Sequence, residues 1–161
     1  MADSTDPAPD DIVLASHVMC IAMHPSAPVV AASSVTGEVQ LHQYAVEGGN
    51  KLLSHIGHHT ESCRALQFSP NGQTLYSGGK DSVIGAFDLN SMKSSGLLTK
   101  AHDTAISSLL VIDDTTLVSG YLPITFLSSN HDAYRAAAHL TVMTMAWSRC
   151  GIYDRGDAVT S

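Results

Sequence analysis

Residues 57–88 read GHHTESCRALQFSPNGQTLYSGGKDSVIGAFD, and this stretch decides the fold. It contains three runs, CRALQF, QTLYSGG and SVIGAFD, in which apolar residues tend to alternate with polar or small ones. A period of two is typical of a strand that buries one face. The turn between the first two runs contains Asn71-Gly72, a pair that suits a hairpin because both residues tolerate positive φ. The stretch therefore predicts an antiparallel β-meander.

The same pattern recurs on both sides of this stretch. Residues 18–25, VMCIAMHP, align with residues 63–70, CRALQFSP, at an offset of 45 residues, with apolar side chains at alternate positions. Residues 106–120 repeat the pattern downstream, first at an offset of 43 residues and then of 42. A single meander of short strands cannot bury both faces of its sheet, so neighbouring copies must stack. The sequence thus predicts an all-β chain that forms part of a β-propeller.

The central copy resembles a complete WD repeat. The similarity lies in Gly57-His58, in the segments LQFSPNG and LYSGGKD, and in Phe87-Asp88, where the family usually has Trp-Asp. The resemblance implies a structural network that joins a His, a strand Ser, a turn Asp and the Trp. We expect the following residues to form this network in the second and third copies: His58, Ser77, Asp81, Phe87, His102 and Ser119. Phe87 lacks the indole N–H, which removes a hydrogen bond worth about 1 kcal/mol but keeps an aromatic ring for packing.

The repeats set the expected domain organisation. We expect an acidic leader over 1–11, a partial propeller over 12–120 with blades at about 12–50, 51–95 and 96–120, and a divergent tail over 121–161. The first copy is weaker, because Ala32 replaces the network Ser, Thr36 replaces the Asp, and His42-Gln43 replaces the final pair. Propellers typically close with 4 to 8 blades. Two complete blades and part of a third are therefore expected to form an open stack that exposes a sheet edge and an apolar face.

The sequence allows two alternative structures for the tail. Ala136, Leu140, Met143 and Trp147 have helical spacing, and the segment AYRAAAHL has high helix propensity, which favours a helix over 132–149. Alternatively, residues 142–148 align with residues 63–69 at an offset of 79, which would make them the first strand of another blade. The helix is the favoured prediction.

Composition narrows the function classes. The formal net charge of −7, with 15 acidic and 8 basic residues, offers no basic patch for nucleic acid, so we expect no direct nucleic-acid binding. No apolar run approaches the roughly 18 residues needed to cross a membrane. Three widely spaced cysteines and a start without a signal sequence indicate a reduced, intracellular protein.

The residues that carry chemistry are better explained by the repeat. The cluster His58, His59 and Cys63 lacks the spacing of a metal site, and residues 78–81, GGKD, lack the spacing of a phosphate-binding loop. Ser77, His58 and Asp81 have the residue types of a hydrolase triad, but the repeat makes them a brace between strands. We therefore expect no enzyme, no cofactor, no metal and no small-molecule substrate.

The resemblance also implies a function. Over residues 11–120 the sequence resembles the branch of the family called WD repeat-containing protein 55, similar in role to other nucleolar propellers that support ribosomal RNA processing. The resemblance implies a non-catalytic scaffold whose protein partners belong to pre-ribosomal particles. It also implies a location in the nucleus or nucleolus, and the cytoplasm is the alternative location. The alternative is a truncated product that has no independent function or competes with a full-length propeller. The expected partner-binding residues lie on rim loops: His59, Glu61, Arg64, Lys80 and Asp103.

Overall fold

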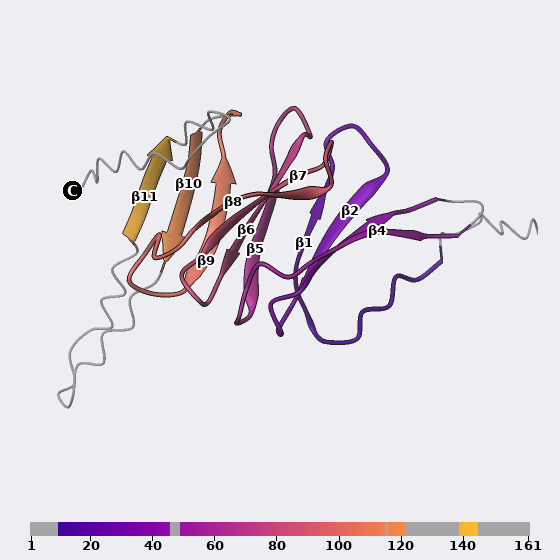
Figure 1. Ribbon diagram of the computed structural model, residues 1–161, viewed down its shortest axis with the longest axis horizontal. Helices are drawn as coiled ribbons and strands as arrows, with labels where there is room; N and C mark the ends of the chain where they lie inside the picture. Colours follow the sequence, from indigo (N-terminus) through magenta and orange to yellow (C-terminus); the bar gives the residue numbers. More distant parts are fainter. Residues whose placement is uncertain (1–9, 46–48, 115, 122–138, 145–161) are drawn as a thin grey trace, which may run out of the picture.

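Three antiparallel sheets stand side by side in the computed structural model (Figure 1). The structure describes residues 10–45, 49–114, 116–121 and 139–144, the last range as backbone only. The first sheet contains β1 (Val18–Met23), β2 (Val29–Ser34), β3 (Val39–Gln43) and β4 (Lys51–Ile56). The second contains β5 (Cys63–Phe68), β6 (Thr74–Gly79), β7 (Ile84–Asp88) and β8 (Lys93–Leu98). The third contains β9 (Ile106–Val111), β10 (Thr116–Tyr121) and β11 (His139–Thr144).

Within each sheet the described strands follow one another as a meander, as the sequence predicted. The stack is confirmed as a partial propeller of two four-stranded sheets and a third, three-stranded one. Its described residues contain no helix, and so none that is long and apolar enough to cross a membrane.

The second sheet lies between the other two, and its side chains alternate between two apolar cores. In the second and third sheets, we call the face that points toward the first sheet the front face. In the first sheet, the front face is the one that points away from the second sheet. The opposite face of each sheet is its back face. Front-face residues Leu66, Phe68 and Leu75 pack in a core with the back of the first sheet. Back-face residues Tyr76 and Ile84 pack in a second core with the front of the third sheet. The alternation predicted from the sequence therefore holds the stack together from both sides.

The innermost strands β1, β5 and β9 lie next to one another, so the sheets approach most closely there. A small residue on the back face of the second strand of each sheet, such as β2 or β6, permits this approach. A Cβ added to Gly78 would lie 2.8 Å from Cγ2 of Ile106, too close for any side chain to fit unless Ile106 moved. Ser33 is at the same repeat position in the first sheet, and its hydroxyl donates a buried hydrogen bond of 2.9 Å to the Cys63 carbonyl.

His24 ties the first two sheets together at the rim opposite the brace described below. Its Nε2 lies 2.9 Å from the Gly72 carbonyl, and its Nδ1 accepts the N–H of Ala27 at 2.9 Å. Because Nδ1 accepts, Nε2 carries the proton and donates to Gly72. Gly72 has φ of 72°, and a Cβ there would overlap the His24 ring, so only glycine fits this turn. The ring also meets Phe68 edge to face, with centroids 5.2 Å apart.

The sheet boundaries differ from the boundaries expected from the repeats. Residues 51–56 were expected to begin the second blade, but they form β4, which pairs with β3 in the first sheet. The expected boundary at residue 96 falls inside β8, which spans Lys93–Leu98 in the second sheet. One sequence repeat therefore supplies the last strand of one sheet and the first three strands of the next, which links successive sheets through the chain.

The helix expected over 132–149 is wrong for residues 139–144. These residues form β11, which pairs with β10 in an unbroken antiparallel ladder from Tyr121↔His139 to Thr116↔Thr144. They are the third strand of the third sheet, and not the first strand of a further blade, so the alternative prediction is also wrong there. A free edge of β10 offers backbone hydrogen bonds to any extended segment, and this tertiary pairing overrides local helix propensity. The rest of the predicted helix lies outside the described residues.

Candidate functional site

A buried hydrogen-bonded brace lies at one end of the second sheet. Ser77 is on β6, Asp81 follows in the β6–β7 turn, and His59 comes from the loop between β4 and β5. His59 Nδ1 lies 3.0 Å from Asp81 Oδ1, and His59 Nε2 lies 2.9 Å from Ser77 Oγ. Because a carboxylate can only accept, Nδ1–H donates to Asp81, and Nε2 of the neutral ring accepts the Ser77 hydroxyl. Three elements are thereby joined through one imidazole.

Asp81 does more than orient the imidazole. Its carboxylate also accepts the N–H of Thr60 at 3.0 Å and the N–H of Val83 at 3.2 Å. These bonds fix the loop before β5 and the turn before β7 in one arrangement. The brace is therefore a structural joint between a loop that arrives from the first sheet and the second sheet itself.

The brace has the residue types and the order of contacts of a Ser-His-Asp triad, but it is sealed. The His59 side chain is 0% exposed and Ser77 is buried. A nucleophilic Ser must meet a substrate carbonyl and present it to oxyanion donors. The backbone of Gly85 lies directly beside Ser77, since a Cβ there would lie 2.8 Å from Ser77 Oγ. The arrangement can stabilise the sheet but gives a substrate no route to Ser77.

His59, and not His58, occupies the network position. His59 was expected on the rim and His58 in the brace, so both assignments are corrected. His58 is half-buried between Gly85 and Phe87, with its ring centroid 6.4 Å from that of Phe87. Burial lowers the pKa of His58, and the neighbouring His59 lowers it further. The sequence contained the correct signal, because His102 lies 43 residues after His59, the same offset that relates Ile106 to Cys63.

Phe87 was expected in the network, but the brace joins His59 to Ser77 and Asp81, and Phe87 takes no part in its hydrogen bonds. Phe87 is buried in the core between the first two sheets, and its ring centroid lies 6.4 Å from that of His58. The aromatic packing is kept, and the ring makes no hydrogen bond.

The third sheet keeps two members of the brace. His102 Nε2 lies 2.6 Å from Ser119 Oγ, and both residues are buried. The His102 ring also packs against Tyr121, with centroids 4.7 Å apart. Burial lowers the pKa of His102, an effect partly offset by the nearby Asp103 carboxylate. In the first sheet, the hydroxyls of Ser34 and Thr36 form a smaller contact of 2.8 Å at the corresponding turn.

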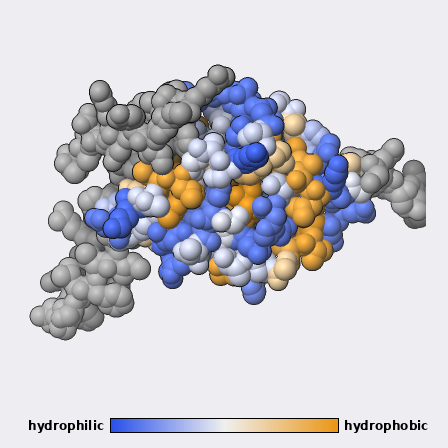
Figure 2. All heavy atoms as spheres, viewed as in Figure 1, coloured by the Kyte–Doolittle hydropathy of each residue, from blue (hydrophilic) through white to orange (hydrophobic). Residues whose placement is uncertain are grey.

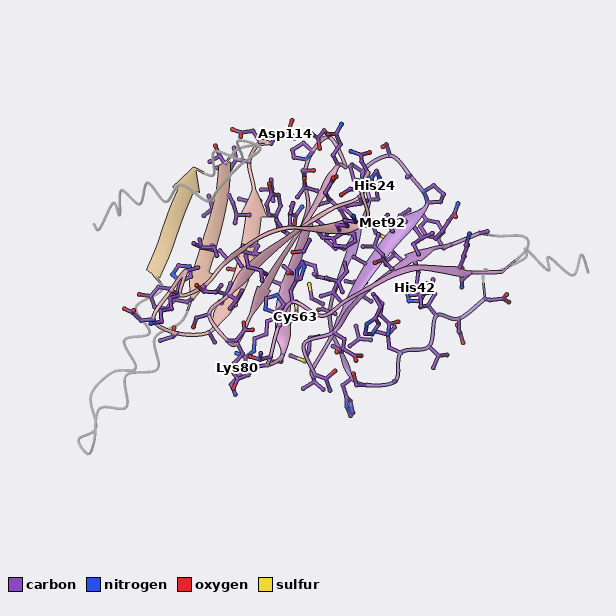
Figure 3. All side chains as sticks on the ribbon, in the orientation of Figure 1. His24, His42, Cys63, Lys80, Met92 and Asp114 are labelled. Carbon is purple, nitrogen blue, oxygen red and sulfur yellow. The ribbon has the colours of Figure 1, made fainter. Side chains whose placement is uncertain are left out.

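The charged residues expected on the rim face solvent, but Arg64 is the second residue of β5 and not a loop residue as expected. Glu61, Arg64, Lys80 and Asp103 are all exposed, and Figure 3 labels Lys80 at the lower rim. Lys80 Nζ lies 3.4 Å from Glu61 Oε2, a half-exposed ion pair that contributes little to stability because solvent screens it. These side chains are therefore free to change partners without cost to the fold.

The described residues contain no group of three or more His, Cys, Asp or Glu side chains suited to a metal ion. Cys63 is fully buried, and burial raises the pKa of its thiol to about 12. A buried thiol with so high a pKa is a poor nucleophile near neutral pH.

Part of the sequence has counterparts among known proteins. Residues 49–88 match the family described as WD domain, G-beta repeat. This segment of the chain is similar to a WD repeat. The matched segment begins just before β4 and ends with β7, so it spans two sheets, as the boundaries above require. WD repeats generally mediate contacts between proteins.

Curated relatives extend the similarity over more of the chain. Over 113 residues, or 70% of the chain, it is 39% identical to WD repeat-containing protein 55 of Danio rerio and 40% identical to that of Rattus norvegicus. The protein of the same name in Homo sapiens is 38% identical over the same length. The chain spans 29% to 30% of the length of these relatives. The expected resemblance to this branch of WD-repeat proteins is confirmed.

Proposed function

We propose that this chain is a non-catalytic interaction module that holds protein partners through the charged rim around the brace. The observation that carries the proposal is the complete burial of the His59 side chain between Ser77 and Asp81. The polar groups with catalytic potential are committed to the fold. The exposed charges next to them are not, and charged residues held on loops by a rigid sheet are suited to recognition.

The finer proposal is that the partners belong to pre-ribosomal particles and that the chain acts in the nucleus or nucleolus. Its support is the similarity to WD repeat-containing protein 55, together with the role that the resemblance implies for this branch. The net charge of −7 favours contacts with proteins over direct contacts with nucleic acid.

Affinity purification of the tagged chain from nuclear extract tests both the proposed interaction surface and the proposed ribosomal role. Reversal of the rim charges by Glu61→Lys with Lys80→Glu removes neither the brace nor a buried group, and should release the partners. Lys93→Glu is a matched control, because Lys93 is an exposed residue at the other end of the second sheet, where β8 begins. We expect pre-ribosomal proteins with the wild type and the control, and their loss with the rim variant.

The outcomes separate the two levels. Partners that are unrelated to ribosome assembly but depend on the rim would overturn the ribosomal role and leave the scaffold. Partners that bind the rim variant as well as the wild type would overturn the rim as the binding surface. Imaging of the tagged chain in cells tests the compartment, and exclusion from the nucleus would contradict it.

A further inference from the structure

The front face of the first sheet exposes apolar side chains that the equivalent face of the second sheet buries. At the 45-residue offset, Ile21 corresponds to Leu66 and Met23 to Phe68. Ile21 is 64% exposed and Met23 is 56% exposed, whereas Leu66 and Phe68 are 5% and 4% exposed because the first sheet covers them. Figure 2 shows an apolar patch over the part of the molecule that contains β1 to β4. The front of the first sheet therefore has the side chains of a stacking face.

The back face of the third sheet is the complementary surface. Ile112 is 57% exposed and follows β9 at the repeat position that His24 holds after β1. Leu110, on the back of β9, is also 57% exposed. Gly120 stands at the repeat position of Ser33 and Gly78, the two small residues that let the next sheet approach. The third sheet thus offers the features with which the first and second sheets receive their neighbours.

We propose that a second copy of this chain covers the front of the first sheet with the back of its own third sheet. Each copy has one front face on its first sheet and one back face on its third sheet. A two-fold axis therefore creates two identical contacts, each between the front face of one copy and the back face of the other. Two copies together contribute six of the sheets that the structure describes, a number within the range of 4 to 8 at which propellers close. The assembly continues the stacking already present between the first, second and third sheets, and does not depend on what the rim binds.

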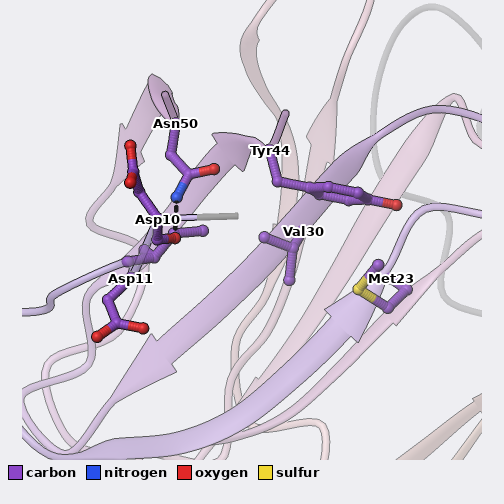
Figure 4. A pocket seen from close by; sticks show the side chains of 7 residues that line it. Asp10, Asp11, Met23, Val30, Tyr44 and Asn50 are labelled. Carbon is purple, nitrogen blue, oxygen red and sulfur yellow. Dashed lines mark hydrogen bonds between the residues drawn. The ribbon is translucent and has the colours of Figure 1, made fainter. Parts of the chain in front are cut away.

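The established interfaces predict the contacts across the new one. His24 meets Phe68 between the first two sheets, so Ile112 meets Met23 of the partner subunit in the corresponding place. Gly78 faces Ile106 and Leu109, so Gly120 faces the partner's Val18 and the partner's Ile21. Beside Met23, the same face has a hollow that Val30 and Tyr44 line, with Asp10 and Asn50 at its edge (Figure 4). This hollow leaves room for the Ile112 side chain.

Sedimentation velocity and light scattering on the full chain measure the assembly. We expect a species of about 34 kDa, twice the 17.0 kDa of one copy. Ile21→Lys places a charge in the contact and should raise the dissociation constant by about tenfold or more. Leu110→Asp should do the same from the opposite face. Val13→Lys is the matched control, because Val13 is 84% exposed and lies outside the sheets.

A mixture of the two variants distinguishes this arrangement from any other. In the mixture, one of the two interfaces contains both substitutions and the other contains neither. We therefore expect Ile21→Lys and Leu110→Asp chains to form a mixed dimer although neither dimerises alone. Recovery of the dimer also shows that both variants fold, and Met23→Asp provides a second front-face variant.

Several results would overturn the proposal. A Leu110→Asp chain that dimerises as well as the wild type would show that the first sheet pairs with itself. Polymers that grow with concentration would show that the stack does not close with two copies. A wild-type chain that stays monomeric, or that binds a complete WD propeller in preference to itself, would assign the exposed face to another occupant.

Discussion

Replacement of Asp81 by Ala tests the brace, because this carboxylate has more described partners than any other brace group. It accepts hydrogen bonds from His59 Nδ1, from the Thr60 N–H and from the Val83 N–H. Water can replace the carboxylate at Thr60, which is exposed, but it cannot reach the His59 ring, whose side chain is 0% exposed. A buried donor left without a partner costs about 1 to 3 kcal/mol. We expect the free energy of unfolding to fall by about that amount.

Urea denaturation followed by far-UV circular dichroism measures the loss. Asp103→Ala is the matched control, because it removes an exposed carboxylate from the same rim and should change the free energy by no more than about 0.5 kcal/mol. The unfolding midpoint should shift without a change in slope, since the exposed surface of the unfolded chain is the same. Equal midpoints for the two variants would refute the brace as a source of stability.

Three further predictions concern packing, pH and thiol reactivity. Gly78→Val should destabilise the chain by about 1 to 3 kcal/mol, measured by urea denaturation, because its Cβ meets Ile106; an unchanged midpoint would contradict the close approach of the sheets. Burial lowers the pKa values of His58 and His102 below their ordinary 6.5, so the unfolded chain binds more protons than the folded chain just below that pH. The free energy of unfolding should therefore be full above pH 6.5 and decline below it. A flat profile of this free energy between about pH 8 and pH 5.5 would contradict the prediction. Iodoacetamide with peptide mapping should label Cys20 in the native chain and leave Cys63 unlabelled until denaturant is added; early labelling of Cys63 would contradict its burial.

Much of the fold follows from short-range pattern. Alternation in CRALQF and QTLYSGG gives the strands, and the offsets of 45, 43 and 42 residues give the stack, because each copy must bury both faces of its sheet. The residue at which one sheet ends and the next begins could not be predicted from this pattern. Whether residues 51–56 pair with the preceding or the following strands depends on which edge is free in three dimensions, and the alternation is the same in both cases.

The brace also contains residues that the sequence predicted correctly and residues that it did not. The resemblance to WD repeats implied roles for Ser77, Asp81, His102 and Ser119, and in the structure Ser77 and Asp81 contact His59 while Ser119 contacts His102. The choice between His58 and His59 rested on the Gly-His pair, whereas the distance to the following strand assigns His59. His24 was missed, because its role depends on a turn of the neighbouring sheet, and no local pattern reveals that contact.

Residues 139–144 show where local propensity misleads. A segment with helical spacing becomes β11, because the edge of β10 satisfies its backbone more completely than an isolated helix would. The ladder belongs to the third sheet, and its formation depends on a strand that lies 18 or more residues earlier in the chain. Such long-range pairing is invisible to a window of sequence.

The reactivity of Ser77 toward a serine-directed fluorophosphonate tests the central claim most directly. The chain has the contacts of a triad, and the claim is that they stabilise the sheet and carry no chemistry. Intact mass spectrometry of the folded chain, incubated with excess reagent, should give the unmodified mass of 17.0 kDa, as a Ser77→Ala chain does for its own mass. A single adduct on Ser77 of the folded chain, absent from Ser77→Ala, would contradict the account and make the brace an active site.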